Sequence, residues 1–215
     1  MGEAVADAGL VALVAPGVRN DGRITARLGT VALASGDTFT LDLYGDGLVA
    51  LEAGPTISRQ LTSNGGEIAA EGGKVVLTAA AASEVVNQLI NMDGITQATS
   101  LAEVDGEIVL GGDVPARAPA RVENTGRVSA RGGRISATAE VIENTGTLDA
   151  SAGGRVDLAG RNVSQQGVIM ADGGGGVTVA FGGSYLDNES ARTTARDGGS
   201  VRVLGDGGSR SFLSG

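Results

Sequence analysis

Six segments of the chain repeat one pattern, and this repeat limits the possible folds more than any other feature of the sequence. Each copy has a turn glycine, and an alanine follows four positions later. In the three most regular copies the turn glycines Gly126, Gly146 and Gly167 are 20 and 21 residues apart. Such a fixed period is typical of repeat proteins, in which each repeat is one structural unit. The six alanines are Ala26, Ala70, Ala98, Ala130, Ala150 and Ala171.

Short segments of alternating apolar residues follow the turns. Examples are KVVLTA at 74–79 and RVDLA at 155–159, which are rich in β-branched residues and are preceded by glycine. These segments predict β-strands, so one coil of about 20 residues holds two or three of them. A single coil cannot bury its inner face, whereas coils stacked about 4.8 Å apart bury a continuous column of side chains. The sequence therefore predicts an all-β, right-handed parallel β-helix with small, aliphatic inward columns.

A column of amide side chains lies two residues before the turn glycines. Stacked asparagines can form a ladder of side-chain hydrogen bonds that also satisfies polar backbone groups of the turns. Asparagine is also common in isolated turns for purely local reasons. We predict the ladder, together with the six alanines, as the structural site of the chain, and we expect the corner glycines to adopt positive φ angles. The column contains Asn20, Asn64, Asn124 and Asn144, with Met92 and Gln165 in the two remaining copies.

The upstream half of the chain is less regular than the downstream half. We interpret residues 1–114 as a β-helix portion with insertions, and residues 115–215 as regular shaft repeats that are truncated at the C-terminus. Alternating residues at 36–54 predict a hairpin or a wider coil, and the helical spacing of apolar residues at 79–91 predicts one short helix beside the stack. The coil ends show no caps, so we expect end-to-end association or fraying.

Composition excludes several classes of function. The chain contains no Cys and no His, which removes thiol and histidine catalysis and the common zinc sites. The net charge of −9 divides into −10 for residues 1–114 (5 basic, 15 acidic) and +1 for residues 115–215 (11 basic, 10 acidic). An acidic chain with 2% aromatic residues lacks the basic patch and the stacking rings of a nucleic-acid binder. No apolar run approaches the ~20 residues of a membrane span, and we expect no cofactor and no bound metal.

Several stretches, taken in order, resemble a known family. The upstream segments read LVALVAPGVRNDGRITARLGTVALASGDTFTLDLYGDGLVALEA at 10–53 and NGGEIAAEGGKVVLTAAAASEVVNQLINMDGITQATSL at 64–101. The downstream coils include GGSYLDN at 182–188 and DGGSVRVLGDGG at 197–208. Together these segments resemble the end of the secretion domain and the first shaft repeats of filamentous-haemagglutinin-like exoproteins, the TpsA proteins of bacterial two-partner secretion.

This resemblance implies a location and a set of partners. It implies a secreted adhesin at the bacterial cell surface, exported through an outer-membrane TpsB-type transporter by way of its POTRA domains. It also implies that the exported protein binds a host or bacterial surface receptor or glycan. The family's signal peptide and Asn-Pro-Asn secretion motifs have no counterpart in this sequence, so no secretion residues are assigned. Because Met1 is followed directly by repeat sequence, we expect the chain to be a piece of a longer protein.

Some polar residues suggest calcium binding, phosphate binding or glycosylation, and each has a simpler explanation. Asp37, Asp42 and Asp46 could hold calcium, but their spacing matches neither an EF-hand nor the nonapeptide repeat, which favours solvent-facing turn acids. The DGGGG segment at 172–176 lacks the Gly-Lys-Ser/Thr ending of a phosphate-binding loop, which favours corner packing. Asn-X-Ser glycosylation sequons, which often arise by chance, begin at Asn162 and Asn188.

Parallel β-helices also include polysaccharide lyases and hydrolases, which use acidic residues as acid and base. Asp149 and Asp157 lie on strand segments near Arg134 and Arg155 and could cluster on one outer face. Outward acids and arginines are more often solvated cross-strand partners, and fold alone does not establish function. Our first hypothesis is therefore a non-enzymatic adhesin shaft. The alternatives are a β-helical carbohydrate-active enzyme and the shaft of a contact-dependent toxin carrier.

Overall fold

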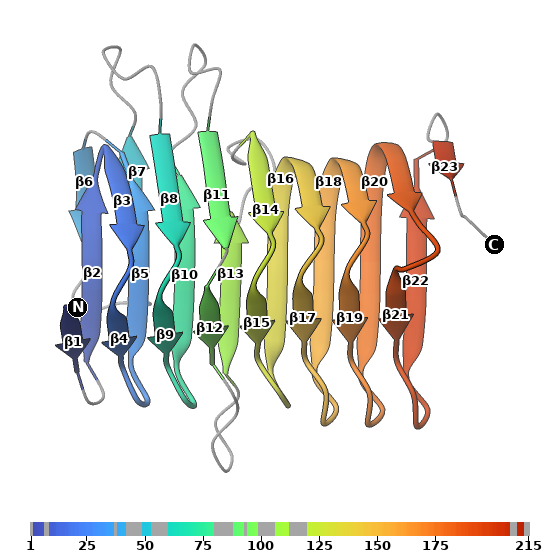
Figure 1. Ribbon diagram of the computed structural model, residues 1–215, viewed down its shortest axis with the longest axis horizontal. Helices are drawn as coiled ribbons and strands as arrows, with labels where there is room; N and C mark the ends of the chain where they lie inside the picture. Colours follow the sequence, from blue (N-terminus) through green and yellow to red (C-terminus); the bar gives the residue numbers. More distant parts are fainter. Residues whose placement is uncertain are drawn as a thin grey trace.

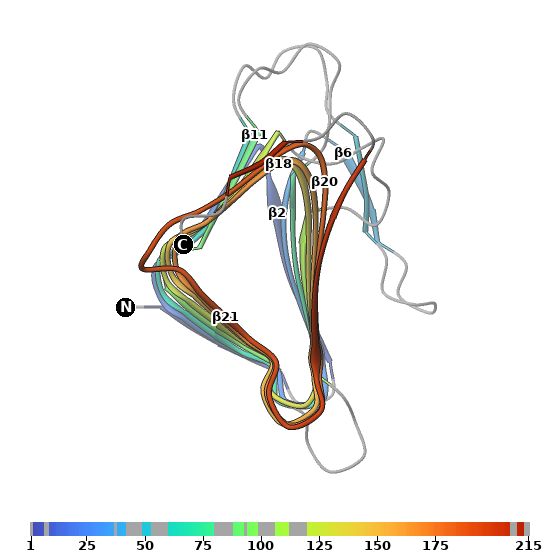
Figure 2. The same cartoon turned by 90° about the vertical axis from the view of Figure 1, so that its right-hand side faces the viewer.

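The computed structural model is a right-handed parallel β-helix with a triangular cross-section (Figures 1 and 2). It describes residues 2–6, 9–36, 38–41, 49–52, 60–79, 88–92, 94–98, 106–111, 120–206 and 210–212. Successive coils lie side by side along the long axis (Figure 1). In Figure 2 the C-terminal end faces the reader, and the chain turns counterclockwise as it advances, which is the right-handed sense. The predicted fold class is confirmed.

Each coil has three faces. The short face is a parallel sheet of three-residue strands, eight of them within the described ranges. These are β1 (Glu3–Val5), β4 (Arg23–Thr25), β9 (Glu67–Ala69), β12 (Ile95–Gln97), β15 (Arg127–Ser129), β17 (Thr147–Asp149), β19 (Val168–Met170) and β21 (Arg192–Thr194). Each pairs in parallel with its neighbours in the adjacent coils, and β1 and β21, at the ends of the described sheet, pair on one side only. The faces of all eight coils therefore stay aligned.

A second parallel sheet supplies the other two faces, which we call the broad face and the ladder face. The broad face begins with β2 (Leu10–Ala15), β5 (Thr30–Ser35), β10 (Lys74–Ala79) and β13 (Glu107–Gly111), and β22 (Ser200–Gly205) ends it. The ladder face begins with β3 (Gly17–Asn20), β8 (Gln60–Asn64), β11 (Gln88–Met92) and β14 (Arg121–Asn124), and β23 (Arg210–Phe212) ends it. Three strands run through both faces: β16 (Arg134–Asn144), β18 (Arg155–Gln165) and β20 (Gly176–Asp187).

The core is a set of columns built from every second residue of each strand. On the broad face, Leu77 of β10 pairs in register with Leu33 of β5 and Leu110 of β13, and all three are buried in one cluster. Alternation places their strand neighbours on the outer side. Two of these neighbours, Ala32 and Ala34, are nevertheless buried, and the hairpin β6–β7 lies on this side of the stack (Figure 2). The upstream part of the broad face is therefore covered, whereas the downstream part is open.

The structure contains two kinds of corner glycine, with and without a positive φ angle, whereas the sequence suggested only the kind with positive φ. Glycines with positive φ, such as Gly132 and Gly153, lie between the short and broad faces. The turn glycines of the repeat, at the corner between the ladder and short faces, do not have positive φ. A Cβ at Gly146 would lie 2.2 Å from the carbonyl oxygen of Gly126 in the preceding coil. At this corner the expectation of positive φ is wrong, because glycine is required there by the close approach of two backbones.

The region of the insertions contains one confirmed alternative and one correction. The strands β6 (Thr38–Leu41) and β7 (Val49–Glu52) form an antiparallel hairpin, so the hairpin was the right choice for 36–54. The helix predicted at 79–91 is wrong where the structure describes that range. Ala79 ends β10, and Gln88–Met92 form β11, which pairs with β8 and β14. Parallel pairing on both sides overrides the helical propensity of this segment; residues 80–87 lie outside the described residues.

Candidate functional site

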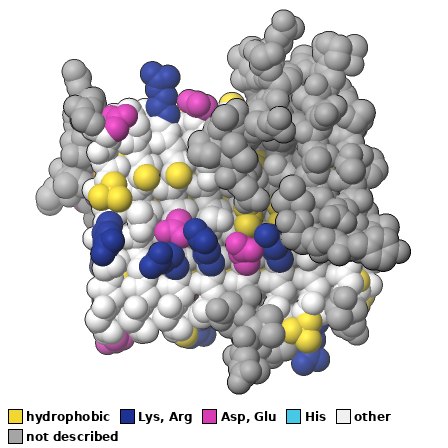
Figure 3. Space-filling view, turned by 180° about the vertical axis from the view of Figure 1, so that it is seen from behind, with side chains coloured by type: hydrophobic (Ala, Val, Ile, Leu, Met, Phe, Trp, Pro, Cys, Tyr) yellow, Lys and Arg dark blue, Asp and Glu magenta, His cyan; other side chains and the backbone are white. Residues whose placement is uncertain are grey.

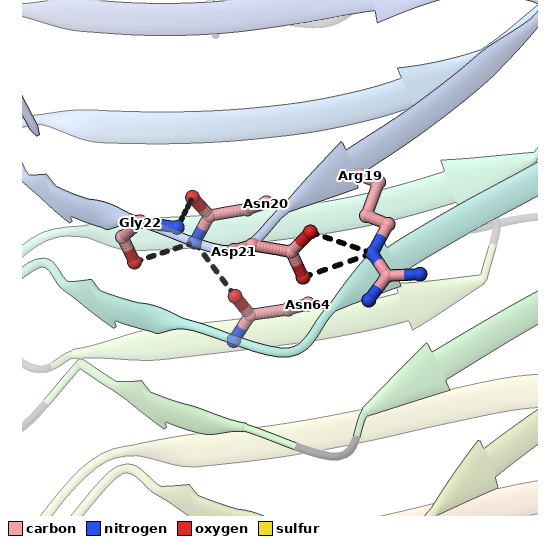
Figure 4. Close-up of polar contacts among 5 residues, drawn as sticks. All are labelled: Arg19, Asn20, Asp21, Gly22 and Asn64. Atoms are coloured by element: carbon pink, nitrogen blue, oxygen red, sulfur yellow. Dashed lines mark hydrogen bonds and ion pairs between the residues drawn. The ribbon is translucent and has the colours of Figure 1, made fainter. Parts of the chain in front are cut away.

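The predicted amide column forms a chain of buried hydrogen bonds along the end of the ladder face. Asn20 Nδ2 donates to Asn64 Oδ1 at 2.8 Å (Figure 4). Further along, Asn124 Nδ2 donates to Asn144 Oδ1 at 2.7 Å, and Asn144 Nδ2 donates to Gln165 Oε1 at 2.7 Å. All five side chains are buried. Each of these bonds links one coil to the next, because parallel in-register strands bring equivalent side chains about 4.8 Å apart.

The ladder is interrupted where Met92 occupies the column. Asn64 Nδ2 donates instead to Thr96 Oγ1 at 3.0 Å and to the Ile95 carbonyl at 3.1 Å. Thr96 occupies a buried position that most other coils fill with an aliphatic residue, so this hydroxyl replaces the missing amide for one neighbour. On the other side of Met92, Asn124 Oδ1 is buried and has no hydrogen-bond donor. Thr96 thus replaces the missing hydrogen-bond partner of Asn64, whereas Asn124 Oδ1 has no replacement among the described residues.

The turn beside the ladder is held by local contacts as well. The backbone N–H of Gly22 donates to Asn20 Oδ1 at 3.1 Å, and on the exposed side Arg19 Nε lies 2.8 Å from both carboxylate oxygens of Asp21 (Figure 4). The inner amide and the outer ion pair thus lie on opposite sides of one turn. An ion pair as exposed as this one adds little stability, so the buried amide carries the structural role.

The six predicted alanines occupy one column between the short face and the broad face. All are fully buried. Each backbone N–H donates to the carbonyl that precedes the corresponding alanine of the next coil; Ala130 N, for example, bonds to Asp149 O at 2.8 Å, and Ala150 N bonds to Met170 O at 2.7 Å. Two sheets converge over this column, so a side chain larger than alanine would push the backbones apart.

The structure separates the two acids that suggested an enzyme. Asp149 lies on the short face, where Arg127 Nη2 approaches it at 3.3 Å and Ser151 donates to it through its backbone N–H and its hydroxyl. Asp157 lies on the broad face and forms an ion pair with Arg134 at 2.9 Å. The expectation that they could cluster on one face is wrong, because β17 and β18 belong to different sheets. Each acid therefore forms an ion pair with a different arginine of a neighbouring strand.

Charged side chains form a band across the broad face (Figure 3). Two ion pairs link neighbouring coils: Lys74 Nζ to Glu107 Oε2 at 3.0 Å, and Arg134 to Asp157 at 2.9 Å. Arg155 stacks in register on Arg134; the described residues offer no ion-pair partner to Arg155 or to Arg202. We call this set the charged band: Lys74, Glu107, Arg134, Arg155, Asp157 and Arg202.

A shallow groove borders the charged band at the corner between the broad and ladder faces. It has a volume of about 490 Å³ and runs across the coils of β16, β18, β20 and β22. Small residues, including Ala159, Gly160 and Ala180, line it together with the charged Glu140 and Arg161. The band and the groove are the features of the open broad face that a partner could contact. Sequence reasoning missed both, although strand alternation already indicated which side chains point outward.

Comparisons with protein-family models, with curated proteins and with solved structures found no match for this chain.

Among the described residues, Arg23 and Tyr185 have shifted pKa values. On the short face, Arg23 donates to Glu67 Oε2 at 2.6 Å, and this hydrogen bond and charge raise the pKa of Arg23. Burial raises the pKa of Tyr185, and the nearby charge of Asp187 acts in the same direction. The shift at Arg23 thus comes from its bond to the adjacent coil, and the shift at Tyr185 comes mainly from burial.

The calcium candidate and the phosphate-loop candidate from the sequence remain to be placed. Asp37, Asp42 and Asp46 lie outside the described residues. The glycine-rich segment 172–176 forms a corner, in which Asp172 Oδ1 accepts a hydrogen bond from the backbone N–H of Arg196 at 2.9 Å. The described part of the chain contains no group of three Asp, Glu, His or Cys side chains suited to a metal ion, and no helix long and apolar enough to cross a membrane.

Proposed function

We propose that this chain is a structural and adhesive portion of a secreted bacterial surface exoprotein of the TpsA type, and that it performs no catalysis. One observation carries this proposal: the buried amides of the ladder bond mainly to the adjacent coils or to the adjoining turn. A chain that uses its interior polar groups in this way makes a rod, with only its outer faces available to partners. Such a rod can present contact surfaces at a distance from the cell.

The same bonding pattern suits export through an outer-membrane TpsB-type transporter with POTRA domains. Each coil bonds to the coils next to it, so a stack of this kind can propagate from any formed end. A chain without Cys cannot be trapped by disulfides before it crosses the membrane. We infer that the coils form in order as they emerge at the cell surface.

The open broad face is the proposed contact surface for a host or bacterial receptor or glycan. Its charged band includes four cationic and two anionic side chains, and the groove beside it adds an apolar strip. Charge complementarity guides association and selects partners. Because Arg155 and Arg202 lack ion-pair partners among the described residues, we expect them to contribute most to binding.

Adhesion and export are tested separately. The purified chain is immobilised on beads, and binding of candidate host cells and neighbouring bacteria is counted. We expect the double variant Arg155→Glu, Arg202→Glu to reduce binding about tenfold or more, because like charges repel across an interface. Arg192→Glu, an exposed arginine on the short face, is the matched control and should bind normally. Circular dichroism verifies that both variants fold.

For export, surface exposure on the producing cells is measured by protease accessibility with and without the transporter gene. Equal exposure in both strains would refute the secretion route, and unchanged adhesion in the double variant would refute the contact face. Cleavage of uronic-acid polymers by the wild-type chain, lost in Asp157→Ala, would overturn the non-enzymatic proposal.

A further inference from the structure

Three neighbouring coils of the broad face differ in the side chains that they turn outward. In β20 the outward positions hold only small residues: Gly176, Thr178, Ala180 and Gly182. The strands on either side, β18 and β22, pair with β20 in parallel and place charged and apolar groups at the same positions. β18 presents Arg155, Asp157, Ala159 and Arg161, and β22 with the residue after it presents Ser200, Arg202, Leu204 and Asp206. The face is therefore lowest along β20 and rises at the charged residues on either side.

The outward residues of β18 and β22 complement one another position by position. Each pair unites opposite charges or a small and a large apolar residue: Asp157 with Arg202, Ala159 with Leu204, and Arg161 with Asp206. The backbones of the two strands lie about 9.6 Å apart, at two coil spacings. Within the described ranges Arg161 and Arg202 form no ion pair, and Leu204 is 53% exposed. The unpaired arginines and the exposed leucine are therefore available to a second molecule.

We propose that the broad faces of two copies of this chain pack together in a two-fold symmetric dimer. A two-fold rotation about a line parallel to β20 turns one rod end for end, so that β20 faces β20 and β18 faces β22. The contacts between the copies are then Arg161 with Asp206, Asp157 with Arg202, and Leu204 with Ala159 in the groove. Every contact occurs twice, because such an interface uses the same patch on both copies.

Sheet packing and charge both agree with this arrangement. Sheets that pack face to face lie about 10 Å apart, and the small residues of β20 permit this approach at the axis. Hydrophobic side chains lie in a row beside the charged band on this part of the face (Figure 3). Rods that pointed the same way would instead bring Arg155 of one copy onto Arg161 of the other, and like charges disfavour that pairing.

The size of the patch sets the expected strength of the dimer. Three strands with four outward positions each cover about 14 by 27 Å, or about 400 Å² per copy. This is about half of the ~800 Å² that each partner buries in a standard interface. We therefore expect a reversible dimer with a dissociation constant on the order of 10–100 μM.

Sedimentation velocity of the purified chain, at concentrations below and above the expected constant, tests the dimer. Arg161→Asp and Asp206→Arg each oppose like charges at both symmetric contacts, so each should weaken self-association about tenfold or more. An equimolar mixture of these two variants should associate again, because every substituted residue then faces the opposite charge. Arg192→Asp alters an exposed arginine of the short face and should dimerise like the wild type. Circular dichroism verifies that all variants fold.

A chemical cross-link locates the axis. The chain contains no Cys, so Ala180→Cys introduces a single thiol that lies opposite its own copy, and a short bis-maleimide should join two such chains. Thr147→Cys places the thiol on the short face and should give no cross-linked dimer. Equal cross-linking of both variants would overturn the proposed geometry.

Three other results would overturn the proposal. The first is a wild-type chain that stays monomeric at every concentration. The second is self-association that Arg161→Asp and Asp206→Arg leave unchanged, which would place the contact at the ends of the rod. The third is a mixture of the two variants that stays monomeric. None of these measurements involves a receptor or a cell, so they stand whether or not the broad face is the adhesive surface.

Discussion

Met92 interrupts the amide ladder, and replacing it by asparagine tests whether hydrogen bonding decides what this column can accept. Met92 is fully buried and lies in register between Asn64 and Asn124. In Met92→Asn, the new Nδ2 can donate to Asn124 Oδ1, which now has no donor. The new Oδ1 can accept from Asn64, as Asn64 Oδ1 already accepts from Asn20. The substitution would therefore complete a continuous ladder from Asn20 to Gln165.

The expected energies nearly cancel. Removing a fully buried methionine side chain costs about 1.5–3 kcal/mol. Supplying a donor to a buried oxygen recovers about 1–3 kcal/mol. The free energy of unfolding of Met92→Asn should therefore lie within about 2 kcal/mol of wild type. This is a small effect for an amide placed in a fully buried apolar position.

Leu77→Asn is the matched control. Leu77 is also fully buried, but its in-register neighbours are Leu33 and Leu110, which offer no polar side-chain group. The variant loses about 1.5–3 kcal/mol of apolar burial and adds an unpaired buried amide at about 1–3 kcal/mol. We expect a destabilisation of about 2.5–6 kcal/mol in total, larger than that of Met92→Asn.

Urea unfolding followed by circular dichroism measures the total effect, and hydrogen exchange measures the local one. The N–H groups of Thr125 and Gly126 donate to the carbonyl of residue 92 at 2.9 and 2.8 Å, so they report on this coil. Their protection should persist in Met92→Asn and fall in Leu77→Asn. If Met92→Asn is as destabilising as Leu77→Asn, the column does not depend on amide pairing, and the account of the ladder is wrong.

Three further predictions concern the corners, the core and pH. Gly146→Ala should destabilise the chain by about 3 kcal/mol or more in urea unfolding, because its Cβ would meet Gly126 O at 2.2 Å, whereas Gly182→Ala, with its nearest neighbour 3.4 Å away, should change stability little. Ala150→Val should cost about 1–3 kcal/mol through overpacking and should lower the thermal midpoint; an unchanged midpoint would contradict the tight column. Because burial raises the pKa of Tyr185, its contribution to stability is complete below pH ~10 and is lost as pH rises through the folded pKa. Tyr185→Phe should therefore flatten the alkaline loss of stability, measured as unfolding midpoints from pH 9 upward, and an identical loss in both proteins would disprove this assignment.

The repeat made the ladder and the alanine column accessible to sequence reasoning. In a parallel stack with a constant period, residues at equal positions in the copies must lie above one another. That rule places Asn124 over Asn144 and Ala130 over Ala150, as the register of β14, β15, β16 and β17 shows. The prediction of a helix at 79–91 was wrong because it gave local helix propensity more weight than the stacking of equal positions in the repeat. Met92 already belonged to the column, and its strand pairs in parallel with both neighbours.

Other features depended on how the coils bend and on what lies against them. The reason for the turn glycines is the distance between two backbones, as at Gly66, where a Cβ would lie 2.2 Å from Gly22 O; no pattern along one chain reports such a distance. Likewise, Asp149 and Asp157 separate because a corner falls between them. The sequence by itself determined which residues stack, because periodicity is one-dimensional. Only the tertiary structure decided which outer surfaces are covered and which polar atoms lack partners, because these depend on contacts between segments that the period does not relate.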